Sequence, residues 1–179
     1  MLRTIAALLV CSIPASAQMP SSETLALSLR TMSKALAACR ETYTHVDRES
    51  TEPFMKEVVG KENYEKDLTS LGHAEKVTNF LIAHPDKISG KALVLILFTS
   101  DDFSVGVGST RAAILARLLD QTTKVPVSEI SKYAPAATAL DGCQKNLFNA
   151  GDDYVDLVMK FVGAEDDALA SKSKITPTR

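Results

Sequence analysis

Side chains able to carry out chemistry are scarce in this 179-residue chain, which contains three histidines and three cysteines. A zinc site needs several such ligands at helical or loop spacing, as in the His-Glu-x-x-His motif. The nearest arrangement is Glu41 with His45, which lie four residues apart on one face of a helix. We interpret His45 as a cation near the end of a helix, where the helix dipole favours positive charge. No serine or cysteine has His73 or His84 at a diagnostic spacing, so we predict neither a metal site nor catalytic residues.

Acidic side chains gather in the segment Gly-Asp-Asp-Tyr-Val-Asp, at Asp152, Asp153 and Asp156. Asp152 and Asp156 share a helix face, and their oxygens are ligands that a divalent cation takes. The loop pattern of an EF-hand is absent, however. Tyr154 and Leu157 continue an apolar stripe, which places the acids on the opposite side of the helix. We therefore predict a solvated acidic face without a metal ion.

The glycine-rich run from Gly106 to Thr110 has some likeness to a phosphate-binding loop, because it leads into a predicted helix. A dinucleotide-binding motif requires a third glycine where Arg111 stands. A P-loop requires the sequence Gly-Lys-Ser/Thr, and a hydrolase elbow requires Gly-x-Ser-x-Gly; neither occurs. The sequence thus predicts no bound nucleotide and no other cofactor.

The segment 99–109 is predicted to be the longest loop of the chain. Apolar residues alternate along it after a pair of acids, and loops carry function more often than helices do. If these side chains are exposed, they form an apolar, acid-rimmed contact for a partner protein. If they fold inward, they fill the interior, and the sequence leaves both alternatives open. The candidate partner-binding residues are Asp101, Asp102, Phe103, Val105 and Val107.

The first seventeen residues have the form of a secretory signal peptide. A basic start at Arg3 precedes an apolar run over 5–13, Pro14 and the small residues 15–17. An apolar run of nine residues is too short to cross a bilayer, which takes about 20 residues in a helix. The alternative is an amino-terminal core helix. We expect cleavage near Ala17-Gln18 and a periplasmic or secreted product, with no transmembrane anchor in the remaining chain.

Cleavage at that point discards Cys11 and leaves Cys39 and Cys143. In an oxidising compartment an even number of cysteines indicates disulfides, and two cysteines allow one pairing. A reactive thiol is the alternative, since Arg40 follows Cys39, but Cys39 lies on an apolar helical stripe. We predict a structural Cys39–Cys143 bridge, worth up to about 4.7 kcal/mol for a loop of this size.

Apolar residues at helical spacing predict one long helix near each end of the mature chain. The first runs from Ser22 to about Val46, with Ser21 or Ser22 as its N-cap, and the last follows Pro135. Since each stripe contains one cysteine, we expect these helices to lie side by side. The stripes are Leu25, Leu29, Met32, Leu36, Cys39, Tyr43 and Val46, and Ala136, Leu140, Cys143, Leu147, Ala150, Tyr154, Leu157 and Phe161.

Between these two helices the pattern predicts a helical stretch over 53–83, interrupted at Gly60, and helices over 110–121 and 129–134. The run Ala92–Phe98 fits a strand or a helix, and we favour a buried central helix over 89–99, because no alternating segment pairs with it. The predicted fold class is an all-α, single-domain bundle of six or seven helices over 18–170, followed by a disordered basic tail over 171–179.

The formal net charge of −2 and the pI of about 5.9 argue against a nucleic-acid-binding protein, which would carry a basic surface. We expect a non-enzymatic, exported protein that binds another protein, as an inhibitor, an immunity protein or an accessory factor. In layout, with one cysteine on an early helix and one on a late helix, the chain resembles the periplasmic type VI immunity proteins. The alternatives are a carrier that holds an apolar small molecule between helices, and an enzyme with a dispersed hydrolase site near His73 or His84.

Overall fold

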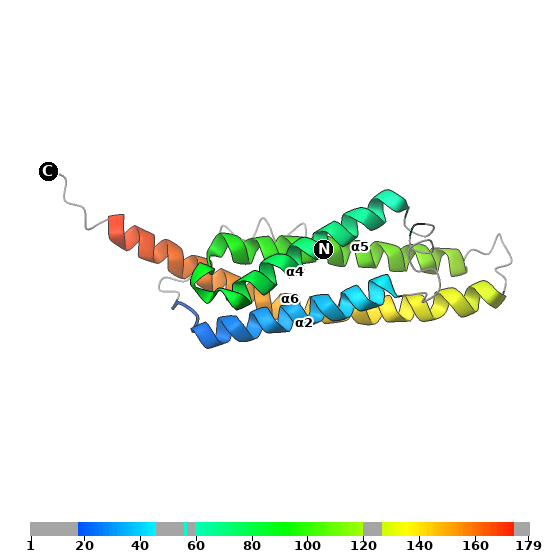
Figure 1. Cartoon of the computed structure of the whole chain (residues 1–179), viewed down its shortest axis with the longest axis horizontal. Helices are drawn as coiled ribbons and strands as arrows, with labels where there is room; N and C mark the ends of the chain where they lie inside the picture. The colour runs from blue at the N-terminus through cyan, green and yellow to red at the C-terminus, as the bar shows by residue number, and fades with distance from the viewer. Residues whose placement is uncertain (1–17, 46–55, 57–59, 120–126, 174–179) are drawn as a thin grey trace.

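Four long α-helices and one 3₁₀ turn make up nearly all of the structure, with no strand in the ranges that it covers (Figure 1). The computed structural model describes residues 18–45, 56, 60–119 and 127–173. The all-α prediction is confirmed, but six or seven helices is wrong, because several predicted segments join into longer ones. The elements are α2 (Ser22–Thr44), α4 (Lys61–Ala83), η2 (Pro85–Lys87), α5 (Gly90–Leu119) and α6 (Val127–Ser173).

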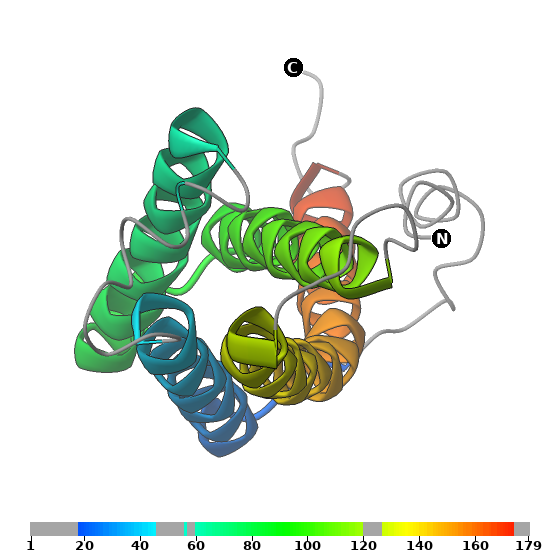
Figure 2. The same ribbon diagram turned by 90° about the vertical axis from the view of Figure 1, so that its right-hand side faces the viewer.

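The four helices surround one core, and each packs against two neighbours. Helices α2 and α5 each lie between α4 and α6, so the order around the bundle is α2, α4, α5, α6 (Figure 2). The carboxyl-terminal turns of α6 extend past the ends of the other helices (Figure 1). Every helix therefore buries one face and presents the opposite face to solvent.

Helix α2 matches its prediction closely. Ser21 is the N-cap, and its side chain accepts a hydrogen bond from the Thr24 amide at 3.1 Å. The helix ends at Thr44, and His45 follows as its C-cap. Six of the seven predicted stripe residues are buried, whereas Val46 lies outside the described residues. The buried residues are Leu25, Leu29, Met32, Leu36, Cys39 and Tyr43.

The predicted Cys39–Cys143 disulfide is present and joins α2 to α6, with 4.9 Å between the two Cα atoms. Both cysteines are buried in the core. On its other side, α2 is tied to α4 by Arg40, whose Nε donates to both carboxylate oxygens of Glu75 at 2.9 Å. The first and last long helices thus lie side by side, as their matching stripes predict.

Helix α5 overturns the prediction of a loop over 99–109, since it is one continuous helix from Gly90 to Leu119. Phe103 and Val107 are four residues apart, which is helical spacing, and both are fully buried. Small polar residues occupy several positions of this stripe, which is why the apolar pattern alone missed it. The inward residues of α5, three or four apart, are Leu93, Ile96, Ser100, Phe103, Val107, Thr110 and Ile114.

Helix α6 also joins two predicted segments, because it continues through Pro135. The exposed proline lies between Tyr133 and Ala136, both buried, so core packing on its two sides keeps the helix continuous. The helix includes the first three residues of the predicted tail and ends at Ser173. The remainder of that tail, the predicted signal peptide, residues 53–55 and 57–59 of the predicted helical stretch, and residues 120–121 of the predicted helix over 110–121 lie outside the described residues.

Candidate functional site

The helical form of α5 separates the predicted partner-binding residues onto two faces. Phe103 and Val107 have no exposed surface, and both belong to the core. Val105 is 59% exposed and Asp102 is also exposed, while Asp101 is half-buried at the border with α6. The loop prediction is corrected accordingly: Phe103 and Val107 hold the bundle together, and only the other three reach the surface.

A buried polar cluster lies behind this outer surface, and it connects three helices. The Tyr43 hydroxyl of α2 donates a hydrogen bond to Oδ2 of Asp67 on α4 at 2.6 Å, and lies 3.3 Å from Oγ1 of Thr110 on α5. Asp67 is only 8% exposed. The Tyr43 ring packs edge-on against Phe103, with ring centroids 5.4 Å apart. This cluster fixes the position of Asp67 at the junction of α4 and α5.

Two glycines of α5 make room for side chains from its neighbours. A Cβ atom at Gly106 would lie 2.2 Å from Oδ1 of Asp67, so only glycine admits this carboxyl group. A Cβ atom at Gly108 would lie 2.5 Å from Nε2 of Gln144 on α6. The glycine-rich run is therefore a close helix contact in the interior of α5, and not the start of a helix as its pattern suggests.

Burial perturbs the titration of this cluster. Desolvation raises the pKa of Asp67 above its usual value, although the Tyr43 hydrogen bond and the charge of Lys66 act in the opposite direction. Desolvation and the hydrogen bond to Asp67 also raise the pKa of Tyr43. Tyr43 therefore stays a hydrogen-bond donor. A cationic neighbour of Asp67, such as Lys66, stabilises its ionised form.

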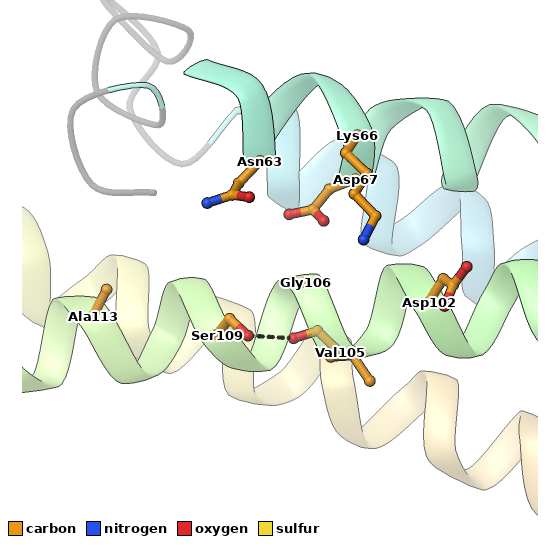
Figure 3. A pocket seen from close by; sticks show the side chains of 8 residues that line it. All are labelled: Asn63, Lys66, Asp67, Asp102, Val105, Gly106, Ser109 and Ala113. Atoms are coloured by element: carbon orange, nitrogen blue, oxygen red, sulfur yellow. Dashed lines mark hydrogen bonds between the residues drawn. The ribbon is translucent and has the colours of Figure 1, made fainter. Parts of the chain in front are cut away.

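The outer side of Asp67 opens into a polar pocket of about 360 Å³ between α4 and α5. Figure 3 shows Asn63, Lys66 and Asp67 extending from α4 toward α5. The facing wall is α5, where the Ser109 hydroxyl bonds back to the Val105 carbonyl at 2.9 Å. The remaining lining residues are Asp102, Gly106 and Ala113.

Two apolar cavities flank α5 as well. One, of about 510 Å³, lies against α4 and is lined by the apolar residues Val77, Phe80 and Leu95 together with His73 and Lys76. The other lies against α6, has a volume of about 60 Å³, and has a mainly apolar surface to which four polar side chains also contribute. Its lining residues are Leu97, Ser100, Asp101, Ser104, Leu147, Phe148, Gly151, Asp152 and Val155. The outer face of α5 is thus bordered by recesses on both sides.

Of the other residues that the sequence singled out, His73 and Asp152 line two of these recesses, whereas His45, Asp153 and Asp156 are not among the residues that line them. His45 hydrogen-bonds through Nδ1 to the Glu41 carbonyl at 3.0 Å, which places it at the end of α2 as predicted. Asp152, Asp153 and Asp156 are exposed on α6, while Tyr154 and Leu157 are buried. Among the described residues, no group of three histidine, cysteine or acidic side chains is arranged to hold a metal ion.

Sequence reasoning missed Asp67, although a signal for it exists. The buried face of α4 repeats at spacings of three and four residues, and Asp67 occupies one of these positions. An acid on an apolar stripe indicates a buried polar contact or a site. The buried residues of α4 are Tyr64, Asp67, Leu71, Ala74, Thr78 and Leu81.

No protein-family model matches the chain, and no curated protein or solved structure matches it either. What bears on its function is therefore the geometry of its own residues, above all the surface around α5.

Proposed function

We propose that this protein binds another protein through the outer face of α5. The proposal rests on the distribution of exposed apolar side chains, which gather around α5. Of the nine large hydrophobic side chains exposed in the described part of the chain, six lie on α5 or line a cavity beside it, including all the exposed phenylalanines. Exposed apolar surface of this kind is typical of interaction sites. The six are Phe80, Leu95, Phe98, Val105, Leu119 and Phe148.

The spacing on this face favours a helix as the contacting element of the partner. Exposed α5 residues recur at alternating intervals of four and three, the repeat along which helices pack nearly parallel. Leu95, Phe98, Val105 and Leu119 are the large apolar members, and Asp102 and Ser109 are polar positions between them. An amphipathic helix laid along α5 would cover this row and reach the cavities on both sides.

The charges that border α5 differ between its two sides. Toward α4, the recesses are lined by Lys66 and Lys76, although Asp67 and Asp102 also line the polar pocket. Toward α6, the cavity is lined by Asp101 and Asp152. We therefore expect acidic residues of the partner beside Lys66 and Lys76 and basic residues beside Asp101 and Asp152, because that arrangement pairs opposite charges.

Export forms part of the proposal. The disulfide is typical of oxidising compartments, and it supports a periplasmic or secreted location for the mature protein. In that setting, a disulfide-linked bundle with one apolar binding face suits an inhibitor, an immunity protein or an accessory factor.

The test is a comparison of single substitutions in a capture experiment with an extract of the producing cells. Phe98→Glu places a charge at the centre of the proposed face, at a side chain that is 56% exposed. Leu27→Glu is the matched control, because Leu27 is 65% exposed on α2, away from this face. We expect the wild type and Leu27→Glu to retain a protein that Phe98→Glu does not retain. Equal capture by the two variants would contradict the proposal.

The same face could instead contact a second copy of the chain or a membrane, and both alternatives can be tested with the same variant. A second copy of the chain would appear as a wild-type dimer in light scattering that Phe98→Glu converts to a monomer. A membrane would appear as flotation with lipid vesicles, since the segment Gly90–Ala116 is long and apolar enough to cross a bilayer by length and composition. Either result would replace the heterologous partner proposed above.

One observation favours a second candidate function, the binding of an apolar small molecule. The cavity of about 510 Å³ beside α4 is lined by Val77, Phe80 and Leu95, and Leu95 belongs to the apolar run Ala92–Phe98. Native mass spectrometry of the purified protein tests this: a ligand that co-purifies with the wild type and is lost in Leu95→Glu would support it. The hydrolase alternative gains no such support, because the cavity that contains His73 has no carboxylate among its lining residues.

A further inference from the structure

The small cavity between α5 and α6 contains a buried hydroxyl group without a partner. Ser104 is 5% exposed, and its Oγ makes no hydrogen bond within the described structure. The other serine and threonine hydroxyls of α5 all bond back to a helix carbonyl, so Ser104 departs from the local rule. Those that bond back are Thr99, Ser100, Ser109 and Thr110. A buried hydroxyl that gives up this bond is available to a group that enters the cavity.

Two carboxylates line the same cavity, and neither is paired with a described cation. Asp101 from α5 and Asp152 from α6 both contribute to its walls, and no ion pair joins either of them to a described lysine or arginine. Burial, followed by the charge of neighbouring Asp102, raises the pKa of Asp101. The cavity thus carries negative charge that its own surroundings do not balance.

The remaining walls are apolar and narrow. Leu97, Leu147, Phe148 and Val155 surround a space of about 60 Å³. A single water molecule needs about 10–15 Å³ of such space, so the cavity accepts a group of a few heavy atoms. A guanidinium group is flat and wide, whereas an ammonium group is compact and donates all its hydrogen bonds from one nitrogen atom. The small volume of the cavity therefore favours an ammonium group.

We propose that this cavity is a binding pocket for a primary ammonium group on an aliphatic stem. In it, the ammonium donates to Ser104 Oγ and is paired with Asp101 and Asp152, while the stem packs against the apolar walls. Within the proposed function, which this inference extends, the ammonium is that of a lysine side chain on the partner helix. A free alkylamine has the same chemistry and is the other source of the group.

The probe for the pocket itself is n-butylammonium, titrated into the isotope-labelled full chain and followed by amide chemical shifts. We expect a saturable response centred on Ser104 and Phe148, and none with n-butanol, which lacks the charge. Asp101→Asn and Asp152→Asn should each weaken binding by roughly fivefold or more, because each removes a charge-assisted contact. Asp153→Asn is the matched control, since Asp153 neighbours Asp152 but does not line the cavity, and it should change binding less than twofold.

A second pair of variants tests the cavity without altering its charges. Gly151 lines the cavity, and a Cβ atom there would meet nothing within 4 Å, so Gly151→Leu adds apolar bulk at the cavity wall without a clash and should weaken the response. Gly142→Leu adds the same side chain to the same helix in open space outside the cavity and should bind as the wild type does. The proposal is overturned if the wild type shows no saturable shifts, or if the Asp153 and Gly142 variants lose as much affinity as the cavity variants.

The two sources of the ammonium group are separated with the captured partner. If the partner supplies a lysine, Asp152→Asn should weaken its binding as well, and n-butylammonium should compete with it. If the partner binds Asp152→Asn as tightly as wild type while n-butylammonium still saturates the cavity, the pocket serves a free amine. Failure to capture any partner would contradict the proposed function, whereas the amine titration would still decide whether the pocket exists.

Discussion

At the scale of single residues, the pairing of Asp67 with Gly106 sets how closely α4 and α5 approach. The carboxyl group lies directly over the glycine and is held there by the Tyr43 hydroxyl at 2.6 Å. Because Tyr43 also approaches Thr110, one tyrosine connects α2 with both of these helices. The same Asp67 lines the polar pocket, so its position shapes the surface beside Val105.

Gly106→Ala should destabilise the fold, against the usual trend for helices. In an exposed helix interior, alanine is more favourable than glycine by about 1 kcal/mol. Here the new Cβ would lie 2.2 Å from Oδ1 of Asp67, so overpacking should lower the free energy of unfolding by about 1–3 kcal/mol. Gly142→Ala is the control, because its Cβ would meet nothing within 4 Å, and it should be stabilising. Urea denaturation measures both, and a stabilised Gly106→Ala protein would contradict the described contact.

Asp67→Asn should reveal the raised pKa of Asp67 as a pH-dependent gain in stability. Above the usual value of 3.8, the folded wild type holds a proton at Asp67 that the unfolded chain releases. The free energy of unfolding of the wild type therefore falls as pH rises through this window, until Asp67 is ionised in the folded state too. Asparagine keeps an oxygen that accepts from Tyr43 and carries no charge.

The measurable quantity is the stability difference between Asp67→Asn and wild type, obtained by urea denaturation between about pH 4 and pH 8. This difference should grow in favour of the variant as pH rises and then become constant. Lys66 is the cation whose charge acts on Asp67, so Lys66→Gln should enlarge the effect. A difference that shrinks with rising pH would mean that the fold lowers the pKa of Asp67.

At the scale of the elements, the pattern of apolar residues predicts a helix well where its buried face is apolar throughout. Helix α2 and the part of α6 beyond Pro135 satisfy this condition, and both were predicted together with the disulfide that joins them. In α5 the buried face includes Ser100 and Thr110, so the apolar repeat is interrupted where the chain remains helical. Phe103, Val105 and Val107 then look like an alternating strand or loop, although two of them are also one helical turn apart.

The candidate site was predictable in part, for the same physical reason. Within the segment 99–109, Asp102 and Val105 are on the surface, and partner binding there stays a prediction. The recesses beside α5 were not predictable, because their walls come from helices that are distant in the sequence. Asp67 reaches the polar pocket from α4, and Phe148 reaches the small cavity from α6. Contacts between helices of this kind follow from packing, which no local pattern encodes.

Pro135→Ala tests whether α6 is continuous. Inside a helix, proline lacks the amide donor and is less favourable than alanine by about 3 kcal/mol. Because Pro135 is exposed and lies within α6, the substitution should raise the free energy of unfolding by about 1–3 kcal/mol. If a helix began at this residue instead, proline would be well placed in its first turn, and alanine would give no gain. Thermal or urea unfolding of the oxidised protein distinguishes the two cases.

At the scale of the whole molecule, the bundle uses its core and disulfide to present one face of α5. The core stripe of α5 packs between α4 and α6, and the row Leu95, Phe98 and Val105 remains uncovered on the opposite side. Recesses flank this row on both sides: lysines and acids line those toward α4, and Asp101 and Asp152 line the small cavity toward α6. Burying such a surface against a partner helix is favourable, at about 25 cal/mol for each Å² of apolar area removed from water.

The most direct test of partner binding at this face is photo-crosslinking in the cells that produce the protein. A photoreactive phenylalanine analogue replaces Phe98 or Val105 on α5, and Leu27 on α2 or Leu169 on α6 serves as the control position. All four side chains are exposed, so each tolerates the probe. The account predicts an adduct with one and the same protein from positions 98 and 105 and none from 27 and 169. Equal adducts at all four positions, or none at 98 and 105, would contradict it.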